Sequence, residues 1–317
     1  MSDELTSARR KVLTKFVKEL MVEPGEKIRV EKDRDPGSTA GTENKQQGQE
    51  LLEEGVELLS RYQARLAAQG TWAVLVVLQA LDTAGKDGAI RHVMSGVNPQ
   101  GVSVHSFKVP SAEELAHDYL WRYSQRLPVR GQIGIFNRSH YEEVIAVRVH
   151  GEYLDKQKLP PDEVGSGIWK RRFREINDWE RYLSDNGVRI VKLFLNLSKE
   201  EQRRRLLRRI DLPDHNWKFS HADVAEREFW DDYQRAISET LSHTSTEWAP
   251  WYVIPADHKW YARIATASVL VNALIELDPH YPHVGKDQRE ELLAAKQALE
   301  AQAPPGASAD PNDPDDE

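Results

Sequence analysis

The sequence predicts a doubly wound α/β fold, in which a parallel sheet carries helices on both faces. Short apolar runs rich in Val and Ile recur along the chain, as expected of strands that are buried on both sides. Segments with the apolar spacing of amphipathic helices separate these runs. In such folds ligands bind at the carboxyl ends of the strands, so the functional residues should lie in the loops that follow them.

Strands and helices alternate through most of the chain. Strands are expected at 72–80, 102–107, 132–137, 189–197 and 251–256. Helices are expected at 88–96, 111–127, 139–150, 168–185, 199–210 and about 258–277. Ser111 and Glu114 have the spacing of a capping box, which fixes where the second of these helices begins.

The amino-acid composition excludes several classes of protein. The 317 residues contain no cysteine, which excludes disulfides and thiol nucleophiles and fits a cytoplasmic location. The N-terminus does not resemble a secretory signal, and no apolar segment reaches the roughly 18 residues of a membrane span. The net charge of −8 argues against nucleic-acid binding as the main role. We therefore expect no membrane and no nucleic-acid partner.

The loop after the first predicted strand has the context of a phosphate-binding loop. Gly85 and Lys86 open a helix, where backbone amides, the helix N-terminus and a lysine attract phosphate. The pattern departs from GxxxxGK[ST], because Ala80 stands where the first Gly belongs and Asp87 replaces the hydroxyl residue. Asp82 can compensate by holding Mg²⁺ directly or through water. The alternative is that Gly85 and Lys86 only form the turn between the strand and the helix.

Polar residues also follow the strand at 132–137. Asn137 ends it where a carboxylate often holds metal, and Arg138 comes next, in position for a phosphate. Glu142 and Glu143 lie just inside the following helix and are candidates for metal or nucleotide binding. Alternatively, the two glutamates only favour a helix N-terminus.

Two basic clusters stand out in this acidic chain. They comprise Lys170, Arg171, Arg172 and Arg174, and then Arg203, Arg204, Arg205, Arg208 and Arg209. Residues four apart share a helix face, which groups Arg204 with Arg208 and Arg205 with Arg209. Such arginines can neutralise a transferring phosphoryl group and form a mobile lid, and Lys218 follows in a loop. The alternative is a pair of solvated helix faces.

These segments together resemble the polyphosphate kinase 2 family. The resemblance covers roughly residues 48–280 and rests on DTAGKDGAIRHVMSGVNPQGV, FKVPSAEELAHDYLWR, GIFNRSHYEEV and the arginine-rich segment before WKFS. It implies a P-loop kinase-like fold and transfer of the terminal phosphoryl of inorganic polyphosphate to ADP, AMP or both, reversibly. The motif at 140–143, His-Tyr-Glu-Glu, is similar to members that accept AMP. Ala80 departs from the family's usual Gly, and its methyl group would crowd the loop if the position needs positive φ.

The resemblance also implies site residues. Asp82, Lys86, Arg138, Glu142 and Glu143 would be catalytic. Polyphosphate would contact Thr83, Ala84, Gly85, Lys86, Asp87, Gly88, Arg204, Arg205, Arg208 and Lys218, while the nucleotide would contact Lys108, Asn137, Arg138 and Glu142. Asp82 and Glu143 would hold Mg²⁺, or Mn²⁺ in its place. The expected partners are polyphosphate, AMP, ADP, ATP, guanine nucleotides and further copies in a dimer or tetramer.

We expect three parts along the chain. They are a helical extension and linker at 1–47, a catalytic domain at 48–300 with its lid at about 199–225, and a disordered acidic tail at 301–317. Two alternative functions stay open: an ATP-dependent nucleoside monophosphate kinase of the same fold, and a non-catalytic polyphosphate- or nucleotide-binding protein, the latter because of Ala80 and Asn137.

Overall fold

The computed structural model describes residues 7–42 and 44–302, without the side chains of residues 215 and 218. Its centre is a six-stranded sheet in the order β1-β6-β5-β2-β4-β3. The strands are β1 (Met21–Val22), β2 (Ala73–Ala80), β3 (Val102–Ser106), β4 (Ile133–Asn137), β5 (Val188–Asn196) and β6 (Trp251–Pro255). The five predicted strands are thereby confirmed.

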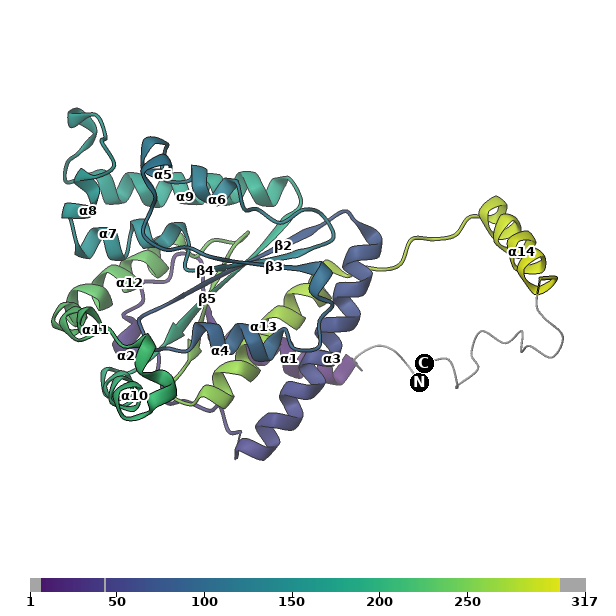
Figure 1. Ribbon diagram of the computed structural model, residues 1–317, viewed down its shortest axis with the longest axis horizontal. Helices are drawn as coiled ribbons and strands as arrows, with labels where there is room; N and C mark the ends of the chain where they lie inside the picture. Colours follow the sequence, from purple (N-terminus) through teal and green to yellow (C-terminus); the bar gives the residue numbers. More distant parts are fainter. Residues whose placement is uncertain (1–6, 43, 303–317) are drawn as a thin grey trace. The chain divides into compact units, whose positions relative to one another are not determined.

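Helices surround this sheet and connect its strands (Figure 1). The α-helices are α1 (Ser7–Leu20), α2 (Val30–Asp33), α3 (Lys45–Gln69), α4 (Lys86–Val93), α5 (Ala112–Ala116), α6 (Trp121–Ser124), α7 (Ala146–Val149), α8 (Glu152–Asp155), α9 (Ile168–Asp185), α10 (Lys199–Asp211), α11 (His221–Ala225), α12 (Trp230–Thr244), α13 (Lys259–Leu277) and α14 (Lys286–Glu300). Short 3₁₀ helices are η1 (Pro99–Gly101), η2 (His140–Glu143), η3 (Pro161–Glu163), η4 (Pro213–Lys218) and η5 (Glu226–Phe229).

The sheet is parallel except for β1, which pairs antiparallel with β6. The central strand β2 is buried along almost its whole length because it pairs with β4 and β5 and is covered on both faces. Its side chains alternate, so that Val74, Val76 and Leu78 join the cluster under α1, α3, α4 and α13. Leu75 and Val77 join the opposite cluster, under α2, α9 and α12. This two-sided cover confirms the predicted fold class.

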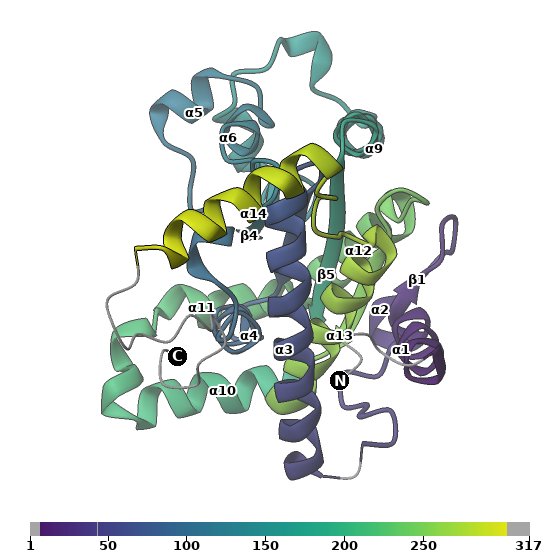
Figure 2. The ribbon, with the colours of Figure 1, turned by 90° about the vertical axis from the view of Figure 1, so that its right-hand side faces the viewer.

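The long helix α3 packs tightly against α13, as Figure 2 shows. Its N-cap Asn44 accepts a hydrogen bond from the amide of Gln47. At Gly48 an added Cβ would lie 2.6 Å from Cε3 of Trp260, so the close approach of the two helices requires glycine there. The sequence pattern did not predict α3 or α12, although α3 covers much of one face of the sheet.

Two of the predicted helices are interrupted. The helix expected at 111–127 begins with the predicted capping box but stops at Ala116, and α6 follows after a turn. The carboxylate of Asp118 accepts a hydrogen bond from the amide of Leu120, a local bond that competes with helix formation. The helix expected at 139–150 splits into η2 and α7, because His140 and Tyr141 turn into the core.

The chain separates into two compact units, Met1–His280 and Tyr281–Glu317. The first contains the sheet together with α1 and α2, whereas we expected the domain to begin at residue 48 and to extend to 300. In the second, every residue from 281 to 302 is exposed, so this unit has no core of its own among the described residues. The tail expected at 301–317 lies almost wholly outside the described residues. In the part of the chain that is described, no helix is both long and apolar enough to cross a membrane.

Candidate active site

A cavity of about 440 Å³ opens at the carboxyl ends of β2 and β4. Asp82 lines it from the loop after β2, and Arg138, Glu142 and Glu143 line it from the loop after β4. Lys108 borders it after β3. The other wall comes from η5, α11 and α12, which lie near these loops (Figure 1). Sequence reasoning placed the site at this edge of the sheet.

The loop between β2 and α4 has the backbone of a tight anion-binding turn. Gly85 has φ +102°, which its missing Cβ permits, and Thr83 has φ +68°, which is uncommon for a β-branched residue. The Thr83 hydroxyl is buried and has no hydrogen-bond partner. Ala80 is not among the residues with positive φ, because it lies in β2 and pairs with Leu195. The condition under which its methyl group would crowd the loop, a positive φ, is therefore not met.

Lys86 begins α4 and folds back over the loop. Its Nζ donates a hydrogen bond of 2.9 Å to the carbonyl oxygen of Ala80. Burial lowers the pKa of Lys86, and the nearby guanidinium of Arg138 lowers it further, while Asp82 and Glu142 oppose this shift. A phosphate oxygen arriving beside Lys86 would therefore meet a poorly solvated ammonium group.

Asp82 and Arg138 bridge the two loops. Nη2 of Arg138 lies 2.9 Å from Oδ1 of Asp82, and both side chains remain more than one third exposed. Arg138 has φ +63°, and its amide donates to the carbonyl of Leu78 at the end of β2. Burial works against the charge of Arg138, but Glu142 and Asp82 outweigh it and raise its pKa. The arginine thus stays charged beside the two carboxylates.

The two neighbouring glutamates differ in their surroundings. Burial raises the pKa of Glu142, although Arg138 and Lys86 pull it down. Glu143 also lines the cavity, but its Oε2 forms an ion pair with Arg172 and accepts a hydrogen bond of 2.7 Å from Gln157. Glu142 is thus the glutamate that interacts with Arg138 and Lys86.

Asn137 ties the end of β4 to α4. Its Nδ2 donates a hydrogen bond of 2.7 Å to Oδ1 of Asp87, and a longer one of 3.4 Å to the hydroxyl of Ser106. The Lys108 side chain is exposed, while its carbonyl accepts a hydrogen bond from Arg122. The polar residues expected after three different strands therefore meet at one edge of the sheet.

The arginine-rich helix α10 lies beside the phosphate loop, as both ribbon views show (Figures 1 and 2). Arg204 is exposed and pairs with Glu200, and Arg208 is exposed as well. Arg205 instead is buried against the loop. The side chain of Lys218 lies outside what the structure describes.

Further cations gather near Arg208. Burial lowers the pKa of Lys259 at the start of α13, and Arg205 and Arg208 lower it further. Burial and Arg91 lower the pKa of Arg263 in the same way. In the other basic cluster, Arg171 and Arg172 are paired with Glu163 and Glu143. Ion pairs also occur in α10, and what distinguishes its cluster is its place beside the loop, where Arg205 and Arg208 act on Lys259.

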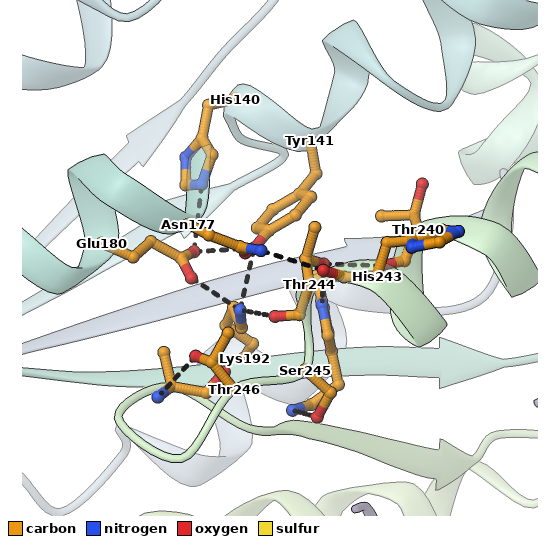
Figure 3. A network of polar contacts seen from close by, with 12 residues as sticks. His140, Tyr141, Asn177, Glu180, Lys192, Thr240, His243, Thr244, Ser245 and Thr246 are labelled. Carbon is orange, nitrogen blue, oxygen red and sulfur yellow. Dashed lines mark hydrogen bonds and ion pairs between the residues drawn. The ribbon is translucent and has the colours of Figure 1, made fainter. Parts of the chain in front are cut away.

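A buried polar network underlies the loop after β4 (Figure 3). Nζ of Lys192 donates to Oε2 of Glu180 at 2.6 Å, to the Tyr141 hydroxyl at 2.8 Å and to the carbonyl of Thr244 at 2.6 Å. Nε2 of His140 lies 3.3 Å from Oε1 of Glu180. Burial alone would raise the pKa of Glu180, but Lys192 and His140 together outweigh it and lower the pKa. The sequence reasoning missed this network, although a lysine inside an apolar strand could have signalled it.

No cluster of three metal-ligating side chains occurs among residues 7–42 and 44–302. One or two carboxylates at a cavity that admits phosphates still suit Mg²⁺, which keeps several waters and takes other ligands from its substrate. Asp82 and Glu142 are such carboxylates. With Lys86 and Arg138 beside them, the site can orient phosphate groups and neutralise charge that develops on a transferring phosphoryl group.

Comparisons with known proteins agree with this chemistry. The family model described as Polyphosphate kinase 2 (PPK2) matches residues 41–281. An ADP-polyphosphate phosphotransferase of Rhodopseudomonas palustris is 52% identical over 81% of this chain and 89% of its own length. An AMP/ADP-polyphosphate phosphotransferase of Meiothermus ruber is 47% identical over 78% of this chain and 89% of its own length. The crystal structure of Polyphosphate Kinase 2 from Arthrobacter aurescens superposes with a TM-score of 0.81 at 41% identity, covering 91% of this chain and 97% of that one.

Proposed function

The chain belongs to the polyphosphate kinase 2 family, and we propose that it transfers the terminal phosphoryl group of inorganic polyphosphate to ADP, AMP or both, reversibly. The observation that carries the proposal is the bridge between Asp82 and Arg138 at the cavity, beside Lys86 at the start of α4. It places a carboxylate, a guanidinium and an ammonium group where a donor and an acceptor phosphate can meet.

The acceptor nucleotide would occupy the cavity. Lys108 and Arg138 can bind its phosphates there, and aromatic side chains such as Phe107 and Tyr123 also line the walls. The donor would approach over the start of α4, on the side of α10. Cations on that side come from Arg204, Arg208 and Lys259. Because the chain as a whole is acidic, these cations would be needed to attract a polyanion.

In the transfer step, an oxygen of the acceptor phosphate attacks the terminal phosphorus of polyphosphate in line with the bridging oxygen. The P–O bond to that oxygen breaks, and the shortened polyphosphate leaves with the electron pair. Lys86 and Arg138 would stabilise the charge on the equatorial oxygens. Asp82 would orient the attacking oxygen and take its proton where it carries one.

A divalent cation fits this site with Asp82 as its protein ligand and Glu142 nearby, the remaining ligands being water and phosphate oxygens. When bound, Mg²⁺ would neutralise the phosphate charge, and Mn²⁺ could replace it. Glu143, which the family resemblance suggested as a ligand, is less suitable because Arg172 and Gln157 already hold its Oε2.

The test is an incubation of the purified protein with long-chain polyphosphate and Mg²⁺, without ATP, and with AMP, ADP, GMP or GDP as acceptor. Chromatography should show ATP from ADP, ADP from AMP, or both. A parallel incubation with ATP and AMP but no polyphosphate tests an ATP-dependent monophosphate kinase. Product in the second incubation alone would contradict the proposal.

A non-catalytic binding protein is the remaining alternative. We expect Asp82→Asn to abolish turnover while a thermal melt shows that the variant is folded. Binding of polyphosphate to the wild type without any product would favour the non-catalytic alternative. We also propose a cytoplasmic homo-oligomer, and light scattering after size-exclusion chromatography measures its mass.

A further inference from the structure

Arg205 uses its whole guanidinium group to hold backbone. Its Nη1 donates to the carbonyls of Thr83 at 3.1 Å and Ala84 at 2.9 Å. Its Nη2 donates to the carbonyls of Ala256 at 2.6 Å and Asp257 at 3.0 Å. Its Nε donates to Glu201 at 2.8 Å. Because an arginine has five N–H groups, these five contacts leave no donor for a phosphate oxygen.

The contacts of Arg205 join three segments. Thr83 and Ala84 belong to the phosphate loop, Ala256 and Asp257 follow β6, and Arg205 itself belongs to α10. Gln202, one turn earlier, adds a hydrogen bond of 3.3 Å to the carbonyl of Asp82. The first half of α10 is therefore fixed to the loop and cannot swing as part of a lid without breaking these bonds.

The bonds also orient the loop. In a trans peptide the carbonyl and the next N–H point in opposite directions, so a carbonyl of Ala84 that faces Arg205 turns the amide of Gly85 away from it. Thr83 is held at φ +68°, a strained conformation that persists only where the surroundings enforce it. The hydrogen bonds of the Arg205 guanidinium group to the carbonyls of Thr83 and Ala84 hold the loop in this conformation.

We propose that Arg205 is a positioning residue, which holds the phosphate loop in its anion-binding conformation and does not contact polyphosphate. This inference rests on the proposed function. It separates Arg205 from Arg208, three residues later in the same helix, which is exposed and available to a polyanion.

The test compares Arg205→Lys with Arg208→Gln for kcat, for KM of polyphosphate and for the dependence of that KM on salt. Arg205→Lys keeps the charge but loses the forked set of N–H donors. Misplacing a catalytic loop lowers the rate by up to about 100-fold, so kcat should fall by about 10- to 100-fold. The salt dependence should stay that of the wild type. Arg208→Gln should raise KM and reduce the slope of log KM against log salt by roughly 1, by analogy with phosphate contacts in nucleic acids.

A reduced salt slope in Arg205→Lys would overturn the proposal, as would an unchanged kcat in a folded variant. Should Arg205→Lys not fold, Glu201→Ala decides, because it removes the partner that orients the guanidinium group through Nε, together with a longer contact of 3.8 Å to the exposed Arg204. That variant should lower kcat without changing the slope, and wild-type kcat would refute the proposal. Wild-type turnover in the same assay is the reference, so failure of the proposed function is seen separately as no turnover in any protein.

Discussion

At the scale of single residues, the strain in the phosphate loop lies at Thr83 and not at Ala80. Ala80 continues the strand, while Thr83 has positive φ and a buried hydroxyl without a partner. Strained residues concentrate where a loop must keep an unusual shape for its ligand. The departure from the usual glycine is therefore tolerated because a strand position does not need glycine's freedom.

Glycine substitutions at the two positions should have opposite effects on stability. Ala80→Gly should lower the free energy of unfolding by about 0.5–1 kcal/mol and leave kcat/KM near the wild-type value, because glycine only weakens the strand. Thr83→Gly should raise the free energy of unfolding by relieving strain, and should lower kcat because the loop becomes less fixed. Urea denaturation and initial rates measure both. A large gain of activity in Ala80→Gly would contradict the structure.

Lys86 should limit activity at alkaline pH. Burial and Arg138 lower its pKa from 10.5, so the ammonium group loses its proton earlier than an ordinary lysine does. The kcat/KM for polyphosphate should therefore decline at a pH below 10.5, since that parameter reports the free enzyme. Lys86→Arg keeps a charge throughout this range and should lose the decline, whatever its absolute rate. A decline at the same pH in both proteins would assign it to another group.

The residues of the site were predictable where they follow strands. Asp82, Lys86, Asn137 and Arg138 could be placed because parallel strands end at a common edge. Arg205 was expected to contact polyphosphate together with Arg204 and Arg208. Unlike them it is buried, which was not predictable, because helical spacing gives faces and not what covers them. Burial against a distant loop is a tertiary property that the spacing of arginines does not contain.

At the scale of elements, side chains of α9 and β5 bind the loop after β4 through buried hydrogen bonds. Glu180 of α9 and Lys192 of β5 are fully buried and bind Tyr141 between them (Figure 3). The strands were predictable because their burial makes continuous apolar runs. The interrupted helices were not, because polar side chains such as His140 leave the helical path to reach partners far along the chain.

Removing one member of this buried pair should be costly. Glu180→Gln or Lys192→Met each leaves the other group without its ionic partner, and should lower the free energy of unfolding by about 3–5 kcal/mol. The double variant should cost less than the sum of the two. Tyr141→Phe, as a control, should cost about 1 kcal/mol for a lost hydrogen bond. Urea denaturation of the wild type and the four variants gives the coupling energy, and additive losses below about 1 kcal/mol each would show that the pair is not coupled.

At the scale of the whole molecule, the fold gathers functional groups from distant parts of the sequence. Loops after β2 and β4 face α10 and α11, so residues from 79 to 237 line one cavity. The chain is acidic overall, yet Arg208 and Lys259 place cations close to the loop. Fold class and the position of the site follow from the alternation of strands and helices, but the end of the compact unit does not, because α14 has the pattern of an ordinary helix.

The last prediction concerns that end. A chain of residues 1–280 should keep the melting temperature and kcat/KM of the full protein, because every described residue from 281 to 302 is exposed and the core ends with α13. A chain that stops at residue 258 is the matched control. It lacks α13, whose buried side chains fill one face of the sheet, and should not fold. Thermal melts and the polyphosphate assay compare the three proteins. A loss of activity in the 1–280 chain would show that residues beyond 280 act on the site, for instance through exposed Leu292 and Leu299 in contact with a second copy.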